Sequence, residues 1–332
     1  MPRLCTVYDT NVYRGLAASR FAQLLKLERN HSVIGYANYA TATEILSQLA
    51  TPDTPDGRSA SAAAGRLVQH CTEYDGSTYS VRFVAPPLEQ IARYIFGVEP
   101  TGQEEFATGY GRILGGWVTE PEHHLAFATV LSGIAEHSAS LRDDYVGTLW
   151  RTVVRTIAPD AKTWSDVGES RELRERLLAA IALGTGRGIL ALGLASQAGG
   201  LIGRSVPAAD EARVTAHILE NFGLIVEYRH RVLEGLVRNG PDMSKRKRAN
   251  GVFDVHVCGS ISGVASLRGV PVVLVTDDRD ILDAAAAISY DAEVKAVDGY
   301  EALLSSNSAF DEWISGVLRR QDERRHRLAT AV

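Results

Sequence analysis

Apolar runs and helical periodicities alternate near the start of the chain. Residues 4–8 (Leu-Cys-Thr-Val-Tyr) form a short apolar run that is typical of a buried strand. Residues 14–28 place Phe21 and several leucines on or near one face, which predicts a helix. Residues 32–36 predict a second strand and residues 42–49 a second helix. This order of strand, helix, strand and helix indicates the beginning of a parallel sheet.

The same rhythm returns after residue 250. The expected elements are a helix over residues 253–267, a buried strand over 270–276, a helix over 281–288, a strand over 293–297 and a final helix from near Asp311. The two α/β stretches therefore lie at opposite ends of the chain, and a single sheet can include both of them.

Helical patterns dominate the middle of the chain. Residues 51–57 (Thr-Pro-Asp-Thr-Pro-Asp-Gly) are typical of a loop. The predicted helices after it cover residues 59–74, 88–96, 122–139, 141–157, 169–183 and 210–238. In the last of these, Asp210 can cap the start, and Asn239-Gly240-Pro241 ends it.

The fold class is therefore α/β, a central parallel β-sheet interrupted by a large all-α insertion. We expect a first part over residues 1–50, the helical insertion over 51–244, a second part over 245–305 and a C-terminal helix over 306–332.

One apolar segment, residues 177–203, is long enough to cross a membrane. Its repeated glycines make it a poor single helix, and Arg187 near its middle would be costly in lipid. We therefore expect two buried helices with a turn near Thr185-Gly186, and no membrane association. The N-terminus lacks the apolar region of a secretory signal.

Composition narrows the function classes only moderately. The 332 residues are 45% apolar and 23% charged, which is ordinary for a globular protein. A formal net charge of −5 argues against coating nucleic acid through bulk charge, although a local basic groove remains compatible with it. The cysteines, Cys5, Cys71 and Cys258, form no CxxC spacing, so we expect free thiols in a reducing cytoplasm.

The strongest chemical signal is a set of four acidic residues at or beside the ends of predicted strands. These are Asp9, Glu44, Asp254 and Asp278. A sheet that joins both ends of the chain would gather them at the carboxyl ends of its strands, where such sheets bind ligands. At about 4 Å and an effective dielectric constant near 20, each carboxylate pair repels by roughly 4 kcal/mol. Divalent cations relieve that repulsion.

Carboxylates alone are a suitable ligand set for Mg²⁺ or Mn²⁺, and such ions can activate water for phosphodiester hydrolysis. Asp9 is placed to be the central ligand, with Glu44 and Asp254 on either side and Asp278 holding a second ion or its water. Asn11 and Thr276 can orient these carboxylates.

In their order along the chain, these motifs resemble the PIN-domain nucleases, which are metal-dependent ribonucleases. The matching segments are Asp9-Thr10-Asn11-Val12, Glu44 in a helix after the second strand, Asp254 opening a late helix, and Thr276-x-Asp278-x-Asp280 after an apolar strand. Each motif is weak alone: Asp-Thr-Asn, for example, is also a good helix cap. The resemblance covers residues 4–50 and 245–300 and leaves the insertion unexplained.

The resemblance implies a PIN-like three-layer fold with a five-stranded parallel sheet. It also implies that Asp9, Glu44, Asp254 and Asp278 are the metal-binding, catalytic residues. By its spacing Asp278 is the ligand in the last motif, with Asp280 as an auxiliary and Asp277 facing away. The small toxins of the family are far shorter than this chain, which argues against a toxin.

Two other functions compete. A PIN-like scaffold that binds RNA or protein without cutting would share the fold. A haloacid-dehalogenase-like phosphatase would explain Thr276-Asp277-Asp278 after a buried strand, but it needs an acid two positions after Asp9, where Asn11 stands.

Three further features carry weaker expectations. Lys245-Arg246-Lys247-Arg248 can hold nucleic-acid phosphates or be a solvated loop. His123 and His124 have no expected role, and His256 is expected to be a packing residue. The arginines of the last helix, Arg319, Arg320, Arg324, Arg325 and Arg327, indicate a solvated helix.

The sequence thus predicts a cytoplasmic, Mg²⁺- or Mn²⁺-dependent endoribonuclease with RNA as substrate. An antitoxin-like or other protein partner and a homo-oligomer are left open.

Overall fold

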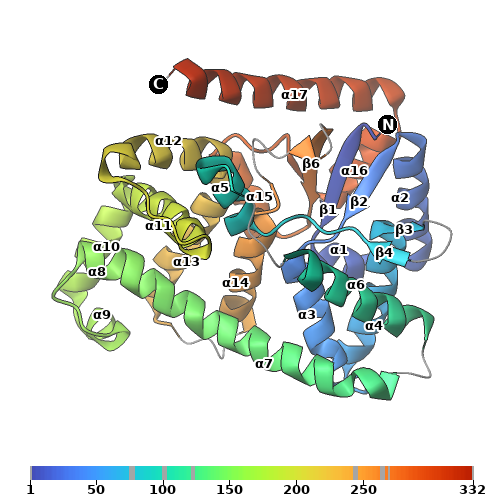
Figure 1. Cartoon of the computed structure of the whole chain (residues 1–332), viewed down its shortest axis with the longest axis horizontal. Helices are drawn as coiled ribbons and strands as arrows, with labels where there is room; N and C mark the ends of the chain where they lie inside the picture. The colour runs from blue at the N-terminus through green and yellow to red at the C-terminus, as the bar shows by residue number, and fades with distance from the viewer. Residues whose placement is uncertain are drawn as a thin grey trace.

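Two strands from opposite ends of the chain pair side by side at the centre of the sheet (Figure 1). The structure is a computed structural model that describes residues 2–74, 79–98, 103–120, 124–241, 246–261, 266–267 and 270–330. Strand β1 (Leu4–Tyr8) is parallel to β6 (Val270–Val275), with Tyr8 opposite Val275. The expectation that one sheet includes both ends of the chain is therefore confirmed.

The rest of the sheet extends from this pair. Strand β2 (Val33–Tyr36) is parallel to β1, and β7 (Val294–Lys295) is parallel to β6. The parallel order is therefore β2-β1-β6-β7. A fifth strand, β5 (Ser266–Leu267), pairs antiparallel with the beginning of β6. The fold class is α/β, as predicted, although the fifth strand departs from an all-parallel sheet.

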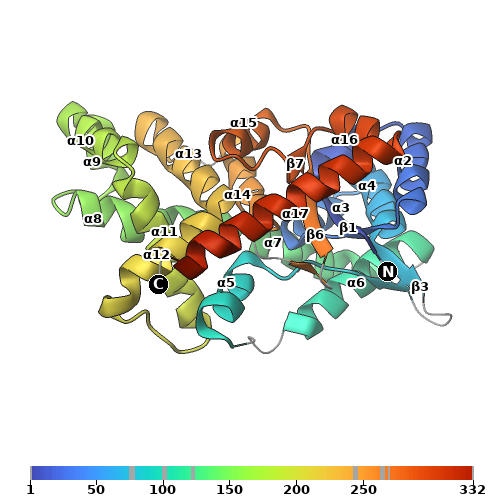
Figure 2. The ribbon, with the colours of Figure 1, turned by 90° about the horizontal axis from the view of Figure 1, so that it is seen from above.

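Helices cover both faces of the sheet (Figures 1 and 2). Successive residues of β1 point to opposite faces, so Leu4 and Tyr8 pack in one core and Cys5 and Val7 in another. The first core includes α2 (Ala18–Asn30) and α16 (Val297–Leu304), and the second includes α15 (Arg279–Ala287). The sheet is therefore the middle of three layers.

The first predicted helix is divided in two. Helix α1 (Thr10–Gly15) ends where Leu16 takes an extended conformation, and α2 follows from Ala18. Leu16 is buried, so core packing rather than helix propensity sets this break. The next helix, α3 (Tyr39–Leu49), begins with Asn38 as its cap, because the Asn38 side chain accepts a hydrogen bond from the Ala40 N–H.

The middle of the chain is mostly helical. Its helices are α4 (Pro55–Cys71), α5 (Pro87–Phe96), α6 (Gln103–Thr119), α7 (His124–Leu149), a π-helical turn (Trp150–Val154), α8 (Arg155–Ile157), α9 (Trp164–Glu169), α10 (Arg171–Ala182), α11 (Thr185–Leu201), a 3₁₀ turn (Ala208–Asp210), α12 (Glu211–Asn221) and α13 (Gly223–Asn239).

The expectation of an all-α insertion is wrong. Strands β3 (Thr72–Tyr74) and β4 (Tyr79–Val81) form a small antiparallel sheet where the sequence pattern predicted the end of a helix. Phe83 then bridges to Ala37 beyond the end of β2. The backbone N–H and C=O groups of this segment pair between β3 and β4 and, at Phe83, with Ala37. A helical periodicity in the sequence cannot reveal such pairing. The four-part division of the chain stays a prediction.

The apolar segment over residues 177–203 contains a break, as predicted. Helices α10 and α11 are bent by 77° at Gly184, which has a φ of +79° that favours glycine. Among the described residues, no single helix has the length and apolar character needed to cross a membrane, and α10 and α11 meet those criteria only when taken together.

The predicted helix over residues 210–238 is interrupted at Phe222. Phe222 is buried and leaves helical geometry (φ −122°, ψ 27°), which separates α12 from α13. A Cβ at Gly223 would lie only 3.3 Å from the Ile288 side chain. Glycine at this position therefore lets the start of α13 lie close to the segment after α15. The Asp210 side chain makes no capping hydrogen bond, contrary to expectation, but α13 does end at Asn239.

Helix α14 (Arg246–Cys258) begins earlier than predicted. Asp254 therefore lies inside a helix and does not open one. Lys245 and the side chains of Arg246, Lys247 and Arg248 lie outside the described residues, so the two readings of this basic run stay open.

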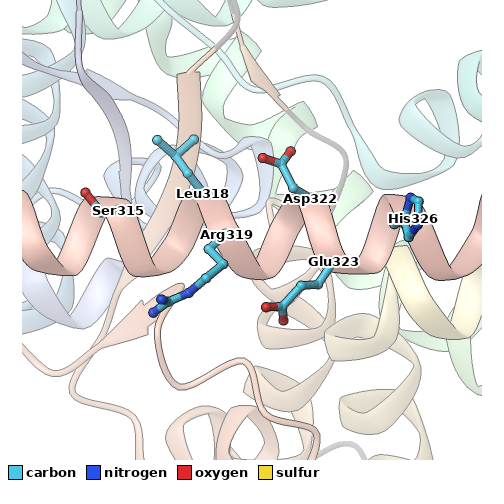
Figure 3. A pocket seen from close by; sticks show the side chains of 6 residues that line it. All are labelled: Ser315, Leu318, Arg319, Asp322, Glu323 and His326. Atoms are coloured by element: carbon cyan, nitrogen blue, oxygen red, sulfur yellow. The ribbon is translucent and has the colours of Figure 1, made fainter.

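Helix α17 (Asn307–Thr330) crosses the molecule diagonally from α16 to α12 (Figure 2). Its outer face lines an open hollow of about 850 Å³, with Leu318 and Asp322 pointing to one side and Arg319 and Glu323 to the other (Figure 3). Arg324 instead is buried and donates to Glu293 at 2.6 Å. The expectation of a wholly solvated helix is therefore wrong at Arg324.

A buried ion pair joins α2, α4 and the sheet. The His70 Nε2 atom of α4 lies 3.3 Å from a Glu28 carboxylate oxygen of α2. Thr6, Tyr8 and Tyr300 donate hydroxyl hydrogen bonds to the other oxygen of Glu28. Burial lowers the pKa of His70, but the Glu28 charge outweighs it and the pKa rises to about 10. Burial raises the pKa of Glu28, but His70 and the hydroxyl donors lower it overall.

We expect His70→Phe to destabilise the fold by about 3 to 5 kcal/mol, because the ring still stacks while Glu28 loses its cation. The His70 contribution is present below its ordinary pKa of 6.5 and is lost as the pH rises through about 10. The Glu28 contribution is present above 4.5 and is lost on acidification. In urea unfolding, the difference in unfolding free energy between the wild type and His70→Phe should therefore shrink as the pH rises toward 10.

Arg171→Ala is the matched control, because Arg171 and Glu175 form an exposed pair on α10. It should change the unfolding free energy by less than about 0.5 kcal/mol. An equally small effect of His70→Phe would contradict the role of the buried pair.

Candidate functional site

Asp9 is held at the point where the two central strands end. It directly follows β1, and its backbone N–H donates to the Val275 carbonyl at the end of β6. Its carboxylate accepts hydrogen bonds from the Thr10 N–H at 2.6 Å and from the Thr276 hydroxyl at 2.8 Å. Asp9 is only 4% exposed. The carboxylate therefore caps α1 and also faces the β6 end.

Asn11 and Thr276 connect the two strand ends, and their role as supporting residues stays a prediction. The Asn11 amide donates to the Thr276 hydroxyl at 3.3 Å, and the Asp277 N–H lies 3.4 Å from the Asn11 side-chain oxygen. The Asp278 N–H also donates to the Thr276 hydroxyl, at 3.0 Å. The hydroxyl hydrogen of Thr276 is therefore directed at Asp9, because its lone pairs already accept two donors.

Asp278 begins α15 as its N-cap. One carboxylate oxygen accepts from the Asp280 N–H at 2.7 Å and from the Ile281 N–H at 3.2 Å. Asp277 is exposed and accepts from the Val297 N–H, so it faces away, as predicted. Asp280 lies in the first turn of α15 and is partly buried.

Glu44 lies on α3 and is paired with a cation. Its carboxylate is 3.4 Å from the Arg14 guanidinium, and both side chains are 16% exposed. Arg14 also donates to the Gln48 side chain at 2.6 Å. Arg14 was not singled out from the sequence, where it is one arginine in a short amphipathic helix.

Asp254 enters the site from α14 and contacts the central helices. Its carboxylate accepts a hydrogen bond at 3.0 Å from the hydroxyl of Tyr228 on α13. Tyr228 was missed by sequence reasoning, because an aromatic residue inside a helix is more often a packing residue. The tyrosine connects the middle of the chain directly to the acidic cluster.

The carboxylates lie close enough together for their charges to raise the pKa values of Asp9 and Asp254. Burial and the charges of Glu44 and Asp278 raise the pKa of Asp9 to about 7, although the hydrogen bond from Thr276 opposes this shift. Burial and the charges of Asp9, Asp278 and Glu44 raise the pKa of Asp254 well above its ordinary value. The fold therefore brings together Asp9, Glu44, Asp254 and Asp278, which the sequence places far apart.

The donor set consists of carboxylate oxygens, which are the ligands that hard divalent cations prefer. Because the acids repel one another, a bound cation would relieve that repulsion. Each acid is, however, turned to a protein group: Thr276, Arg14, Tyr228 or a helix N-terminus. Within the described residues, no three His, Cys, Asp or Glu side chains already form a group that could hold a metal.

Cys258 and His256, which lie on α14 with Asp254, are poorly suited to act as a nucleophile or a base. Burial and the Asp254 charge raise the pKa of the Cys258 thiol, so it stays protonated. Burial and the Arg229 charge lower the pKa of His256 to about 4, which keeps its ring neutral. His124 stacks on Trp117, consistent with its having no assigned role, and His123 lies outside the described residues. All three cysteines are buried, and none of them forms a disulfide.

Comparison with known proteins found no similarity that counts as a match: no family model, no curated protein and no solved structure corresponds to this chain. The function is therefore argued from the geometry of the site.

We expect Asp254→Asn to raise the unfolding free energy of the metal-free protein by roughly 1 to 3 kcal/mol at neutral pH. Asparagine can still accept the Tyr228 hydrogen bond, while the repelling charge is gone. The pKa of Asp254 is higher in the folded protein than its ordinary value of 3.8. The stabilisation that results is fully present below pH 3.8 and is lost as the pH rises through the raised pKa. The difference in unfolding free energy between Asp254→Asn and the wild type should therefore grow as the pH increases. Urea unfolding at several pH values measures this difference.

Asp283→Asn is the matched control, because Asp283 is exposed on the neighbouring helix α15. It should leave the stability unchanged at each pH. A destabilised Asp254→Asn protein would contradict mutual repulsion in the cluster.

Proposed function

We propose that the protein is a PIN-like metal-dependent nuclease, and that it is an endoribonuclease. The observation that carries this proposal is the clustering of four carboxylates from separate elements at the ends of β1 and β6. Burial, and then the charges of the neighbouring acids, raise the pKa values of Asp9 and Asp254. A protein without a cation to bind has no reason to retain such a cluster, because it lowers stability.

Asp9, Glu44, Asp254 and Asp278 would hold one or two Mg²⁺ or Mn²⁺ ions. When bound, such an ion supplies an activated water and neutralises charge on the phosphoryl oxygens. Asp9 is the central ligand, because Thr276 and the Thr10 N–H fix both of its oxygens in place. Asn11 acts through Thr276, by holding the hydroxyl that orients Asp9.

Two cationic or polar partners would respond to the ion. Arg14 now pairs with Glu44, and Tyr228 now donates to Asp254. With a cation held at these carboxylates, Arg14 would contact a phosphate of the substrate. RNA as the substrate, a cytoplasmic location, an antitoxin-like or other protein partner and a homo-oligomer stay predictions from the sequence.

The second candidate is a PIN-like scaffold that binds RNA or protein without cutting. It is favoured by one observation, namely that every acid of the cluster already contacts a protein group. The haloacid-dehalogenase-like phosphatase is less well supported. Asn11 stands where that mechanism needs an acid, and its amide is engaged with Thr276.

Asp9→Asn should reduce Mn²⁺-dependent cleavage of a single-stranded oligoribonucleotide by more than about 100-fold. Loss of a residue that only supports a metal ligand would cost about 10- to 100-fold. Mn²⁺ at 100 times its Kd should stabilise the wild-type protein by about 2.7 kcal/mol, and the variant by much less. A gel-based cleavage assay and thermal unfolding with and without Mn²⁺ measure the two effects.

Asp277→Asn is the matched control, since Asp277 follows the neighbouring strand β6, is exposed and accepts a hydrogen bond from the Val297 N–H. It should retain both cleavage and the Mn²⁺ effect. Full cleavage by Asp9→Asn would rule out the mechanism, whereas Mn²⁺ binding without cleavage in the wild type would favour the scaffold.

A further inference from the structure

A cavity of about 480 Å³ opens between the end of α5, the loop that follows α11 and the start of α12. Its walls come from residues 94–96 of α5, residues 204–207 of the loop and one face of α12. Helix α11 packs against both α5 and α12, and Figure 1 shows the three helices together. None of the four acids is among the described residues that line this cavity. Its volume is sufficient for a small organic molecule.

The loop that forms one wall is fixed by its own backbone. Gly203 has a φ of +65°, and the Arg204 N–H donates to the Gly199 carbonyl of α11 at 2.9 Å, which is the geometry of a Schellman motif. A Cβ at Gly199 would lie 2.5 Å from the Arg204 carbonyl oxygen and 3.0 Å from the Phe96 ring. The loop, α11 and the end of α5 are therefore in close contact, so the wall that carries Arg204 is preformed.

Two arginines and one carboxylate line the cavity. The Asp210 carboxylate accepts a hydrogen bond from Arg213 at 2.8 Å, so these two charges balance each other. Arg204 is exposed, and among the described residues its guanidinium donates only to the Phe96 carbonyl, at 3.4 Å. The residues that line the cavity therefore leave the positive charge of Arg204 without a carboxylate to balance it.

His217 adds a neutral hydrogen-bond donor to the same wall as Arg213. It lies one turn after Arg213 on α12, on the same face of the helix. Burial and the Arg213 charge lower the pKa of His217, which keeps its ring neutral at pH 7. The Tyr94 hydroxyl accepts a hydrogen bond from the buried Asn221 amide at 3.3 Å and lies 3.4 Å from the His217 Nδ1 atom. With the hydroxyl hydrogen donated to Nδ1, the ring carries its hydrogen on Nε2, which is then a donor.

These donors select the kind of ligand. Guanidinium groups present parallel N–H donors that match the oxygens of a phosphate, and an imidazole N–H can donate to the same group. Three donor groups suit the three terminal oxygens of a phosphate better than the two oxygens of a carboxylate. The remaining wall is mostly apolar and includes Ile95, Phe96, Val206 and Val214. A molecule with a phosphate at one end and an apolar or aromatic part at the other matches both kinds of surface.

We propose that this cavity is a binding site for a small organic phosphate. Arg204, Arg213 and His217 bind the phosphate, while Phe96 and Val206 contact the organic part. The site is separate from the acidic cluster, and it does not rest on the proposed nuclease function.

The test uses the full chain in EDTA, with phenyl phosphate and adenosine monophosphate (AMP) as probes. Both should raise the melting temperature of the wild type, because a ligand that binds only the folded protein stabilises it. Inorganic phosphate lacks the apolar part, adenosine lacks the charge, and benzoate replaces the phosphate by a carboxylate, so each should have a smaller effect. Isothermal titration calorimetry gives the Kd of AMP for the wild type and for each variant.

Arg204→Met keeps the aliphatic stem and removes the unbalanced charge. It should weaken the binding of AMP by about 10-fold or more. Arg58→Met is the matched control, because Arg58 is also exposed and also donates to a backbone carbonyl, that of Asp53, but does not line the cavity. It should bind AMP like the wild type.

Asp210→Asn should change the affinity in the opposite direction. It removes the carboxylate that pairs with Arg213, so both guanidinium groups become available and AMP should bind more tightly. Asp160→Asn is the matched control, because Asp160 is exposed and paired with Arg176 away from the cavity lining. It should leave the Kd of AMP unchanged.

Three outcomes would overturn the proposal. Unchanged binding of AMP by Arg204→Met, or weaker binding by Asp210→Asn, would remove the phosphate site. A benzoate effect as large as that of phenyl phosphate would overturn phosphate as the ligand. Asp9→Asn should bind AMP in EDTA like the wild type; loss of binding there, with Arg204→Met unaffected, would place AMP at the acidic cluster instead.

Discussion

The parallel pairing of β1 with β6 is the constraint on which the rest of the structure depends. It aligns Tyr8 with Val275, so the residues that follow both strands meet at one edge of the sheet. The hydrogen bond from Thr276 to Asp9 spans 267 positions of the chain and exists only because of this register. A shift by one residue would turn Asp9 to the other face and separate the acids. The candidate site is therefore a direct consequence of strand register.

Charge in the interior is handled in two different ways. On the face of the sheet that packs α2 and α4, Glu28 and His70 neutralise each other and are surrounded by hydroxyl donors. At the strand ends, by contrast, several carboxylates lie close together, and burial and the neighbouring charges raise the pKa values of Asp9 and Asp254. The first arrangement stabilises the fold. The second lowers stability wherever these acids are ionised, because their charges repel one another.

The central helices are part of the site as well as of the fold. Tyr228 of α13 donates a hydrogen bond to Asp254, and Arg229, the next residue of α13, lies over the Tyr145 ring of α7. These helices pack against α14, which carries Asp254 itself. The acidic cluster is therefore held by the central helices as well as by the sheet.

The sequence by itself determined the features that depend on local patterns: the apolar strands β1 and β6, the acids that follow them, the glycine break at Gly184 and the end of α13. It also indicated that Asp9, Glu44, Asp254 and Asp278 belong together, through their order along the chain. Only the tertiary structure decided the break at Phe222, the burial of Arg324 and the contacts of Tyr228 and Arg229. These depend on which distant groups lie opposite a residue, and periodicity reports the buried face of a helix but not its partner.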